Sequence, residues 1–228
     1  MNNAHRSGLF AAALLLGADI ACAAQRPTVV ELFTSQGCSS CPPADIYLTE
    51  LARNAGVLAL AFHVDYWDSL GWKDPYALAA ATERQERYAA HLRKGPYTPQ
   101  MVVDGGSVIV GSDRRGVAAA IERARSEAAN VEVTLASGGA TLTIEVGSGT
   151  GAAQILLVGF DRQHETAVMH GENAGKTLLE SSIVRSLTGI GRWSGEPLKL
   201  SIAAPAGEGV AVLLQSDDGR IVGAATTK

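Results

Sequence analysis

The first half of the chain alternates short apolar runs with longer stretches that are apolar on one side only. Residues 28–34 (TVVELFT) and 57–64 (VLALAFHV) are rich in β-branched and aliphatic side chains, which is typical of strands. The second run is almost wholly apolar, which indicates a strand covered on both faces. Residues 44–54, 75–93 and 114–128 repeat apolar positions at helical spacing. Together these patterns predict an α/β arrangement of strands and helices.

Capping and turn residues separate these elements. Asp74 followed by Pro75 predicts the start of the second helix, because Asp caps a helix N-terminus and Pro fits its first turn. A Gly-Gly pair separates two apolar runs at residues 100–104 and 107–110. Glycine readily adopts the positive φ of a tight turn, so these two runs predict a β-hairpin.

The pattern changes near residue 130. Beyond it helical spacing nearly vanishes, and Gly, Ser and Asp separate short alternating runs. These runs cover residues 131–135, 140–146, 154–160, 198–202, 209–215 and 220–225. Several short strands at such spacing indicate a β-sandwich. The predicted fold is an α/β domain with an inserted helix over residues 25–130, followed by a mostly antiparallel β-sandwich-like domain over residues 131–228.

Residues 1–24 have the pattern of an export signal. The apolar run at residues 9–18 is too short to span a bilayer, because a spanning helix needs about 20 residues. Ala21 and Ala23 form an Ala-x-Ala cleavage site. The alternatives are a buried N-terminal helix and a lipidated Cys22, whose preceding residues fit a lipoprotein signal poorly. No other segment is apolar and long enough to span a membrane, so we expect a periplasmic or secreted product.

Composition and charge narrow the classes of function. The chain is 46% apolar and 18% charged, so it can bury a core and is not expected to be disordered. Its formal net charge is −4 and it has no basic tract, which argues against nucleic acid as a partner, because phosphate binding needs clustered Lys and Arg. Three cysteines are too few for a disulfide-stapled mini-domain or a four-cysteine zinc site.

Cleavage of the predicted signal would leave two cysteines, Cys38 and Cys41, between a predicted strand and a predicted helix. A reactive cysteine must be a thiolate, and a helix N-terminus favours negative charge. A redox-active pair is one interpretation of this Cys-Ser-Ser-Cys motif. A static disulfide is a second. A copper or zinc site that includes His63 is a third, because thiolate and imidazole are suitable ligands for these metals.

The order of elements resembles the thioredoxin fold. The residues that carry the resemblance are the Cys-Ser-Ser-Cys motif after the first strand, and Thr98–Pro99 before the hairpin. The resemblance implies that Cys38 is the nucleophile and that Cys41 resolves the mixed disulfide. It also implies that Pro99 is cis beside the dithiol and that the backbone at Thr98 pairs with the bound substrate. The fold class expected for residues 25–130 is therefore thioredoxin-like.

Three further residues are candidates for the site. Thioredoxin buries an acid beneath its dithiol, and the resemblance implies that Glu31 could take a proton from Cys41. The alternative is a solvent-facing Glu31. Asp65 and Trp67 follow the second strand, and strand C-termini form the functional edge of a parallel sheet. We expect both to line a substrate groove, or else to anchor the inserted helix.

The whole chain is similar to a family of exported bacterial proteins of uncharacterised function, which combine a thioredoxin-like domain with a C-terminal β region. The matching stretches are ELFTSQGCSSCPPAD, FHVDYWDSLGWKDP, YTPQMVVDG and GENAGKTL. The resemblance implies a thiol–disulfide oxidoreductase that needs no organic cofactor. Its partners would be protein or small-molecule thiols and disulfides, and a partner redox protein. The alternatives are a copper or zinc binding protein and a binding module with a structural disulfide.

Overall fold

The computed structural model describes residues 26–127 and 131–227, so the predicted export signal lies outside the described residues. The described chain forms three α-helices, namely α1 (Pro42–Leu51), α2 (Ala79–Leu92) and α3 (Arg114–Glu127), and a short 3-10 helix at Asp68–Leu70. Its strands are β1 (Thr28–Thr34), β2 (Val57–His63), β3 (Gln100–Val103), β4 (Ser107–Val110), β5 (Val133–Gly138), β6 (Thr141–Val146), β7 (Ala153–Ala167), β8 (Thr177–Trp193), β9 (Leu198–Ala203), β10 (Gly209–Ser216) and β11 (Ile221–Thr227).

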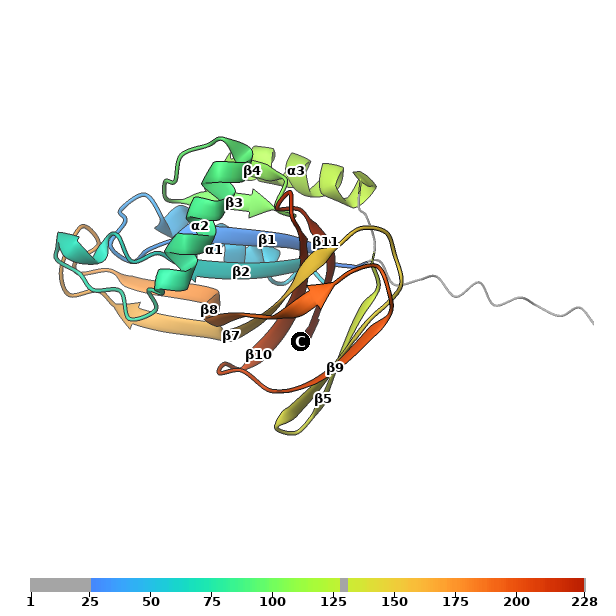
Figure 1. Ribbon diagram of the computed structural model, residues 1–228. Coiled ribbons are helices and arrows are strands. Elements are labelled where there is room, and N and C mark those ends of the chain that lie inside the picture. Colours follow the sequence, from blue (N-terminus) through green and yellow to red (C-terminus); the bar gives the residue numbers. More distant parts are fainter. Residues whose placement is uncertain (1–25, 128–130, 228) are drawn as a thin grey trace, which may run out of the picture.

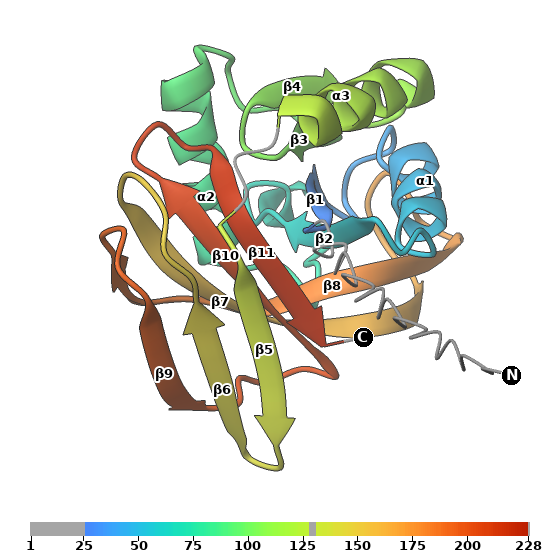
Figure 2. The same ribbon diagram turned by 90° about the vertical axis from the view of Figure 1, so that its right-hand side faces the viewer.

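Eight of these strands form one mixed sheet in the order β11-β10-β7-β8-β2-β1-β3-β4 (Figure 1). β1 runs parallel to β2 and antiparallel to β3, and β8 pairs in parallel with β2 at Ala61 and Ile183. The strands β5, β6 and β9 form a second sheet, which Figure 2 shows as a separate layer beside β10 and β11. Apolar side chains of β6, β7 and β10 fill the space between the two sheets.

The predicted fold class, a thioredoxin-like α/β domain followed by a β-sandwich-like domain, is wrong. The chain is mostly β, and one sheet combines strands from both halves of the sequence. The missing element was β8, whose apolar pattern is interrupted by polar residues such as Glu180 and Ser181. These residues are buried because they face polar partners in the N-terminal half. The predicted boundary near residue 130 falls at residues 128–130, outside the described residues.

The local predictions for residues 28–110 are confirmed, with two shifts. β1, β2 and the β3–β4 hairpin lie where their patterns predict. α1 begins at Pro42, earlier than expected, because two prolines fit the first turn of a helix. α2 begins at Ala79 rather than at Pro75, and the Asp74 carboxylate accepts hydrogen bonds from the backbone N–H groups of Gln36 and Tyr76 in the loop before it.

Both faces of the β1–β2 region are covered, as the apolar pattern of residues 57–64 predicts. Val30 and Leu32 of β1 pack with apolar residues of α1 and α3 on one face. Val29 and Phe33 pack with α2 and with β7, β8 and β10 on the other. Successive β1 side chains therefore reach different helices. In the described part of the chain, no helix is long and apolar enough to cross a membrane.

Candidate dithiol site

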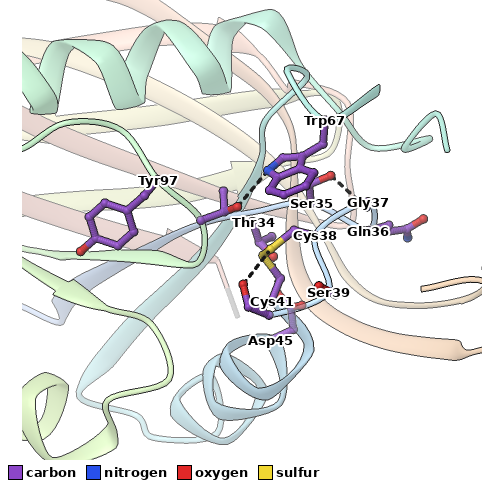
Figure 3. Close-up of a disulfide and its surroundings, with 12 residues drawn as sticks. Thr34, Ser35, Gln36, Gly37, Cys38, Ser39, Cys41, Asp45, Trp67 and Tyr97 are labelled. Atoms are coloured by element: carbon purple, nitrogen blue, oxygen red, sulfur yellow. Dashed lines mark hydrogen bonds between the residues drawn. A yellow bond between two sulfur atoms is a disulfide. The ribbon is translucent and has the colours of Figure 1, made fainter. Parts of the chain in front are cut away.

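The two cysteines lie in the loop between β1 and α1, and they form a disulfide with their Cα atoms 5.4 Å apart (Figure 3). We call residues 35–41 the dithiol loop. The backbone N–H of Cys38 donates to the carbonyl of Ser35 at 3.1 Å, and that of Cys41 donates to the carbonyl of Cys38 at 3.2 Å. Both cysteines are buried, whereas Ser39 and Ser40 between them are exposed.

Cys41 is the N-cap residue of α1, so the pair lies at the positive end of a helix dipole. The carbonyl of Cys41 accepts hydrogen bonds from the backbone N–H groups of Ala44 and Asp45 at 2.8 and 3.2 Å. Pro42 and Pro43 occupy the first turn and have no N–H to donate. The helix therefore favours a thiolate through its dipole but offers it fewer amide donors than an ordinary N-terminus.

A buried carboxyl group lies one turn into α1. Asp45 follows Cys41 by four residues, and its Oδ1 accepts a hydrogen bond from the Thr34 hydroxyl at 2.8 Å. Burial, together with the nearby Glu180 carboxylate, raises the pKa of Asp45 to about 8. Figure 3 shows Asp45 beneath the disulfide. A carboxyl group with such a pKa is protonated at neutral pH and can exchange its proton with a neighbouring thiol.

A second set of buried polar side chains lies behind the dithiol loop. His63 Nδ1 and Asp74 Oδ2 are 2.7 Å apart, and Gln36 Nε2 donates to Glu180 Oε2 at 2.6 Å. His63 Nε2 and Glu180 Oε1 lie 3.8 Å apart, and neither atom has a hydrogen-bond partner among the residues that the structure describes. Burial by itself lowers the pKa of His63, but the carboxylates of Asp74 and Glu180 outweigh burial and raise it to about 9. His63 is therefore protonated at neutral pH, behind the dithiol loop.

The loop between β7 and β8 forms one wall of the site. We call its residues 168–176 the hairpin tip. Asn173 Nδ2 donates to the carbonyls of Gln36 and Cys38, both at 2.9 Å. Glu172 Oε2 accepts a hydrogen bond from the backbone N–H of Ser39 at 3.1 Å. Sequence reasoning assigned no role to the hairpin tip, because these contacts join residues more than 130 positions apart.

Three of the predicted site residues lie beside the dithiol loop. Trp67 Nε1 donates to the Thr98 hydroxyl at 2.9 Å, and a Cβ atom placed on Gly37 would lie 3.2 Å from Cβ of Trp67. The Thr98–Pro99 peptide bond is cis, as the resemblance implied. A Cβ atom placed on Gly111 would lie 2.9 Å from Cβ of Ala44 and 3.2 Å from Cβ of Pro99. Pro99 is therefore close to the first turn of α1.

Glu31 is not brought to the dithiol. It lies on the face of β1 that packs against α2, where its carboxylate is 2.5 Å from Arg84 Nε and also accepts a hydrogen bond from the Tyr88 hydroxyl. The Glu31 side chain faces neither Cys41 nor solvent, since it is fully buried in this ion pair. The buried carboxyl on the other face of β1 is that of Asp45, four residues after Cys41. The helical spacing of Asp45 from Cys41 was the signal that could have found it.

The Asp65 side chain also forms its contacts away from the dithiol loop. Its Oδ1 accepts a hydrogen bond from the Thr82 hydroxyl at 2.6 Å, and its backbone N–H donates to the same hydroxyl at 3.1 Å. Thr82 belongs to α2, so Asp65 anchors that helix, which is the alternative stated for it above. His63 points its ring nitrogens toward Asp74 and Glu180. Across residues 26–127 and 131–227, no group of three or more His, Cys, Asp or Glu is arranged to hold a metal ion.

Fold and site together define a mostly β protein with a buried disulfide, between Cys38 and Cys41, at a helix N-terminus, and a buried carboxyl of raised pKa in that helix. The chain belongs to a protein family of unknown function, DUF1223, whose sequence model matches residues 29–215.

Two solved structures are similar to this chain. A crystal structure of a protein from Agrobacterium tumefaciens has 35% sequence identity and a TM-score of 0.79, and the match covers 87% of this chain and 92% of that one. HBP35 of Porphyromonas gingivalis has 14% identity and a TM-score of 0.59, over 89% of this chain and 75% of that one, which indicates a shared fold alone. No curated protein matches the chain.

Proposed function

We propose that the protein is an exported thiol–disulfide oxidoreductase that uses Cys38 and Cys41. The observation that carries the proposal is the disulfide at the N-terminus of α1 with the buried, protonated carboxyl of Asp45 beneath it. The helix dipole favours a thiolate, and the carboxyl can supply or accept the accompanying proton. A disulfide that only constrains the chain would need neither the helix dipole nor the carboxyl group.

The reaction begins with the pair oxidised. A substrate thiolate attacks Sγ of Cys38 and forms a mixed disulfide, and the bond to Cys41 breaks with its electron pair on Cys41 Sγ. Cys41 then takes the proton from the Asp45 carboxyl. The second substrate thiol loses its proton to water and attacks the substrate sulfur of the mixed disulfide. Cys38 leaves as a thiolate, so two electrons have passed from the substrate dithiol to the pair.

The reverse sequence reduces a substrate disulfide, and Asp45 then accepts the proton of Cys41. A second thiol or disulfide, from a partner redox protein or a small molecule, returns the pair to its starting state. Trp67 and Thr98 are half-buried at the rim of the site and would contact the substrate chain. The chemistry needs no organic cofactor.

One observation favours a second candidate function, a binding module whose disulfide is structural. Both cysteines are fully buried, so neither sulfur is open to a substrate in this conformation. A structural disulfide would resist exchange with glutathione, and its loss would lower the stability of the protein.

Trapping with Cys41→Ser tests the proposal. Without the resolving thiol, the mixed disulfide between Cys38 and its substrate should persist and identify the partner. Cys38→Ser is the matched control, and it should trap nothing. If Cys41→Ser also traps nothing where control oxidoreductases trap their partners, and the wild-type disulfide does not exchange with glutathione, the binding module is the correct function.

A further inference from the structure

Side chains of the hairpin tip form hydrogen bonds with the backbone of the dithiol loop. Two adjacent tip residues, Glu172 and Asn173, make three hydrogen bonds, and their partners are the carbonyls of Gln36 and Cys38 and the N–H of Ser39. These three groups lie on and beside Cys38. The position of Cys38 is therefore set by a segment from the other half of the sequence.

The amide orientation of Asn173 is fixed by its partners. Its Nδ2 faces two carbonyl oxygens, and its Oδ1 accepts a hydrogen bond from Lys176 Nζ at 2.9 Å. The side chain is fully buried, so the two carbonyls of the dithiol loop have this amide as a donor away from solvent. An aspartate here would place an oxygen against two oxygens, because a carboxylate is an acceptor only.

The hairpin tip is itself a closed turn. The N–H of Gly175 donates to the carbonyl of Val168 at 2.8 Å, and the N–H of Val168 donates to the carbonyl of Lys176 at 2.9 Å. Gly171 and Gly175 have φ angles of 75° and 80°, which glycine adopts without the cost that other residues incur. Asn173 is thus presented to the dithiol loop by a braced turn.

We propose that Asn173 is a positioning residue for the dithiol, which holds the dithiol loop in the geometry of the disulfide and so opposes its reduction. This inference rests on the proposed function and concerns the equilibrium between the oxidised and reduced forms of the same site. Reduction separates the sulfurs from a bonded distance of about 2.05 Å to a non-bonded contact of roughly 3.5–4.0 Å. The sulfurs separate by rotation of the cysteine side chains or by movement of the dithiol loop, and the hydrogen bond from Asn173 to the carbonyl of Cys38 opposes the second. Contacts that are stronger in one state shift the equilibrium toward that state.

The test is the equilibrium of the full-length protein with mixtures of reduced and oxidised glutathione. Asn173→Asp and Asn173→Ala should each raise the equilibrium constant for reduction of the disulfide about tenfold, which corresponds to about 30 mV for a two-electron couple. Met169→Ala is the matched control: this residue of the hairpin tip is exposed, and the equilibrium constant of its variant should stay within about twofold of wild type.

A purely structural Asn173 would lower the melting temperature of the oxidised and reduced forms equally and leave the equilibrium constant unchanged, which would overturn the proposal. Hydrogen exchange of the wild-type protein keeps the test independent of variants that fail to fold. The amides of residues 36–39 and 171–176 should exchange faster in the reduced form than in the oxidised form, and equal rates would overturn the proposal as well. A wild-type disulfide that does not equilibrate with glutathione at all would instead remove the proposed function, and the tuning role with it.

Discussion

The hydroxyl of Thr34 donates a hydrogen bond to the carboxyl of Asp45, and neither side chain reaches solvent beyond a few per cent of its surface. Thr34 is the last residue of β1 and Asp45 lies in α1, so the contact closes the loop that carries both cysteines. The hydrogen bond favours the ionised carboxyl, but burial and Glu180 outweigh it, and the carboxyl keeps its proton at neutral pH. This proton is the one that the proposed reaction uses.

Asp45→Asn should slow reduction of the Cys38–Cys41 disulfide at neutral pH by about 10², the lower end of the usual effect of a positioned acid or base. The rate of the wild-type protein should fall as pH rises through about 8, where Asp45 loses its proton, and that step should vanish in the variant. Stopped-flow reduction by dithiothreitol measures both, after division by the thiolate fraction of the reductant. Thr34→Val is the control: it removes a hydrogen bond that lowers the pKa of Asp45, so the step should move to higher pH.

The free energy of unfolding should fall by several kcal/mol between about pH 5 and pH 9. The pKa of Asp45 is raised from 3.8 to about 8, so the folded state retains a proton that the unfolded state has already lost, and stability declines over this interval. The pKa of His63 is raised from 6.5 to about 9, so its contribution is complete below 6.5 and is lost as pH rises through 9. Urea unfolding of the oxidised protein at a series of pH values checks this. Below pH 8 the free energy of unfolding should fall less steeply with pH in Asp45→Asn than in wild type. An unchanged slope would contradict the raised pKa of Asp45.

Glu31→Gln should destabilise the protein by about 3–5 kcal/mol, because it leaves the buried Arg84 guanidinium without its counter-charge. The dependence of disulfide reduction on pH should not change, since Glu31 lies on the opposite face of β1 from Asp45. Urea unfolding measures the first effect and dithiothreitol reduction the second. The double variant Glu31→Leu with Arg84→Met should recover most of the stability. A changed pH profile in Glu31→Gln would return Glu31 to the site.

Gly111→Ala should lower the free energy of unfolding by about 1–3 kcal/mol, the usual cost of overpacking. The added methyl would lie 2.9 Å from Cβ of Ala44 and 3.2 Å from Cβ of Pro99, so it forces α1 and the Thr98–Pro99 segment apart. Gly95→Ala is the matched control, because a Cβ atom there would meet no described residue within 4 Å. Thermal unfolding of both variants measures the difference in stability. Equal melting temperatures would mean that α1 and Pro99 have room for the added methyl group.

The local part of the site was predictable from the sequence, because short-range patterns determine it. The strand before the cysteines and the helix after them are each encoded within about ten residues, and both are confirmed. The side of β1 that faces the dithiol was predictable too, since Glu31 alternates with Val30 and Leu32 and must point away from α1. The mistaken assignment of Glu31 came from the resemblance and not from this periodicity.

The part of the fold that joins the two halves of the sequence was not predictable, because buried polar residues interrupt the apolar pattern of β8. β8 contains Glu180 and Ser181 at buried positions, which are normally apolar in a strand. Their burial is explained only by partners in the other half of the chain, namely Gln36 and Thr49. Asn173 is a turn residue by its sequence context, and only the folded chain places its amide at the carbonyl of Cys38.

The position of β8 beside β2 has a consequence for how this protein can be divided. β2 is an apolar strand in the interior of the sheet, and β8 lies along one of its edges. A fragment that ends after α3 would retain both cysteines but leave that edge of β2 without a neighbour. An exposed apolar strand edge is a template for pairing with other chains. We therefore expect a fragment of residues 26–127 to self-associate, and the C-terminal half to prevent this in the full chain.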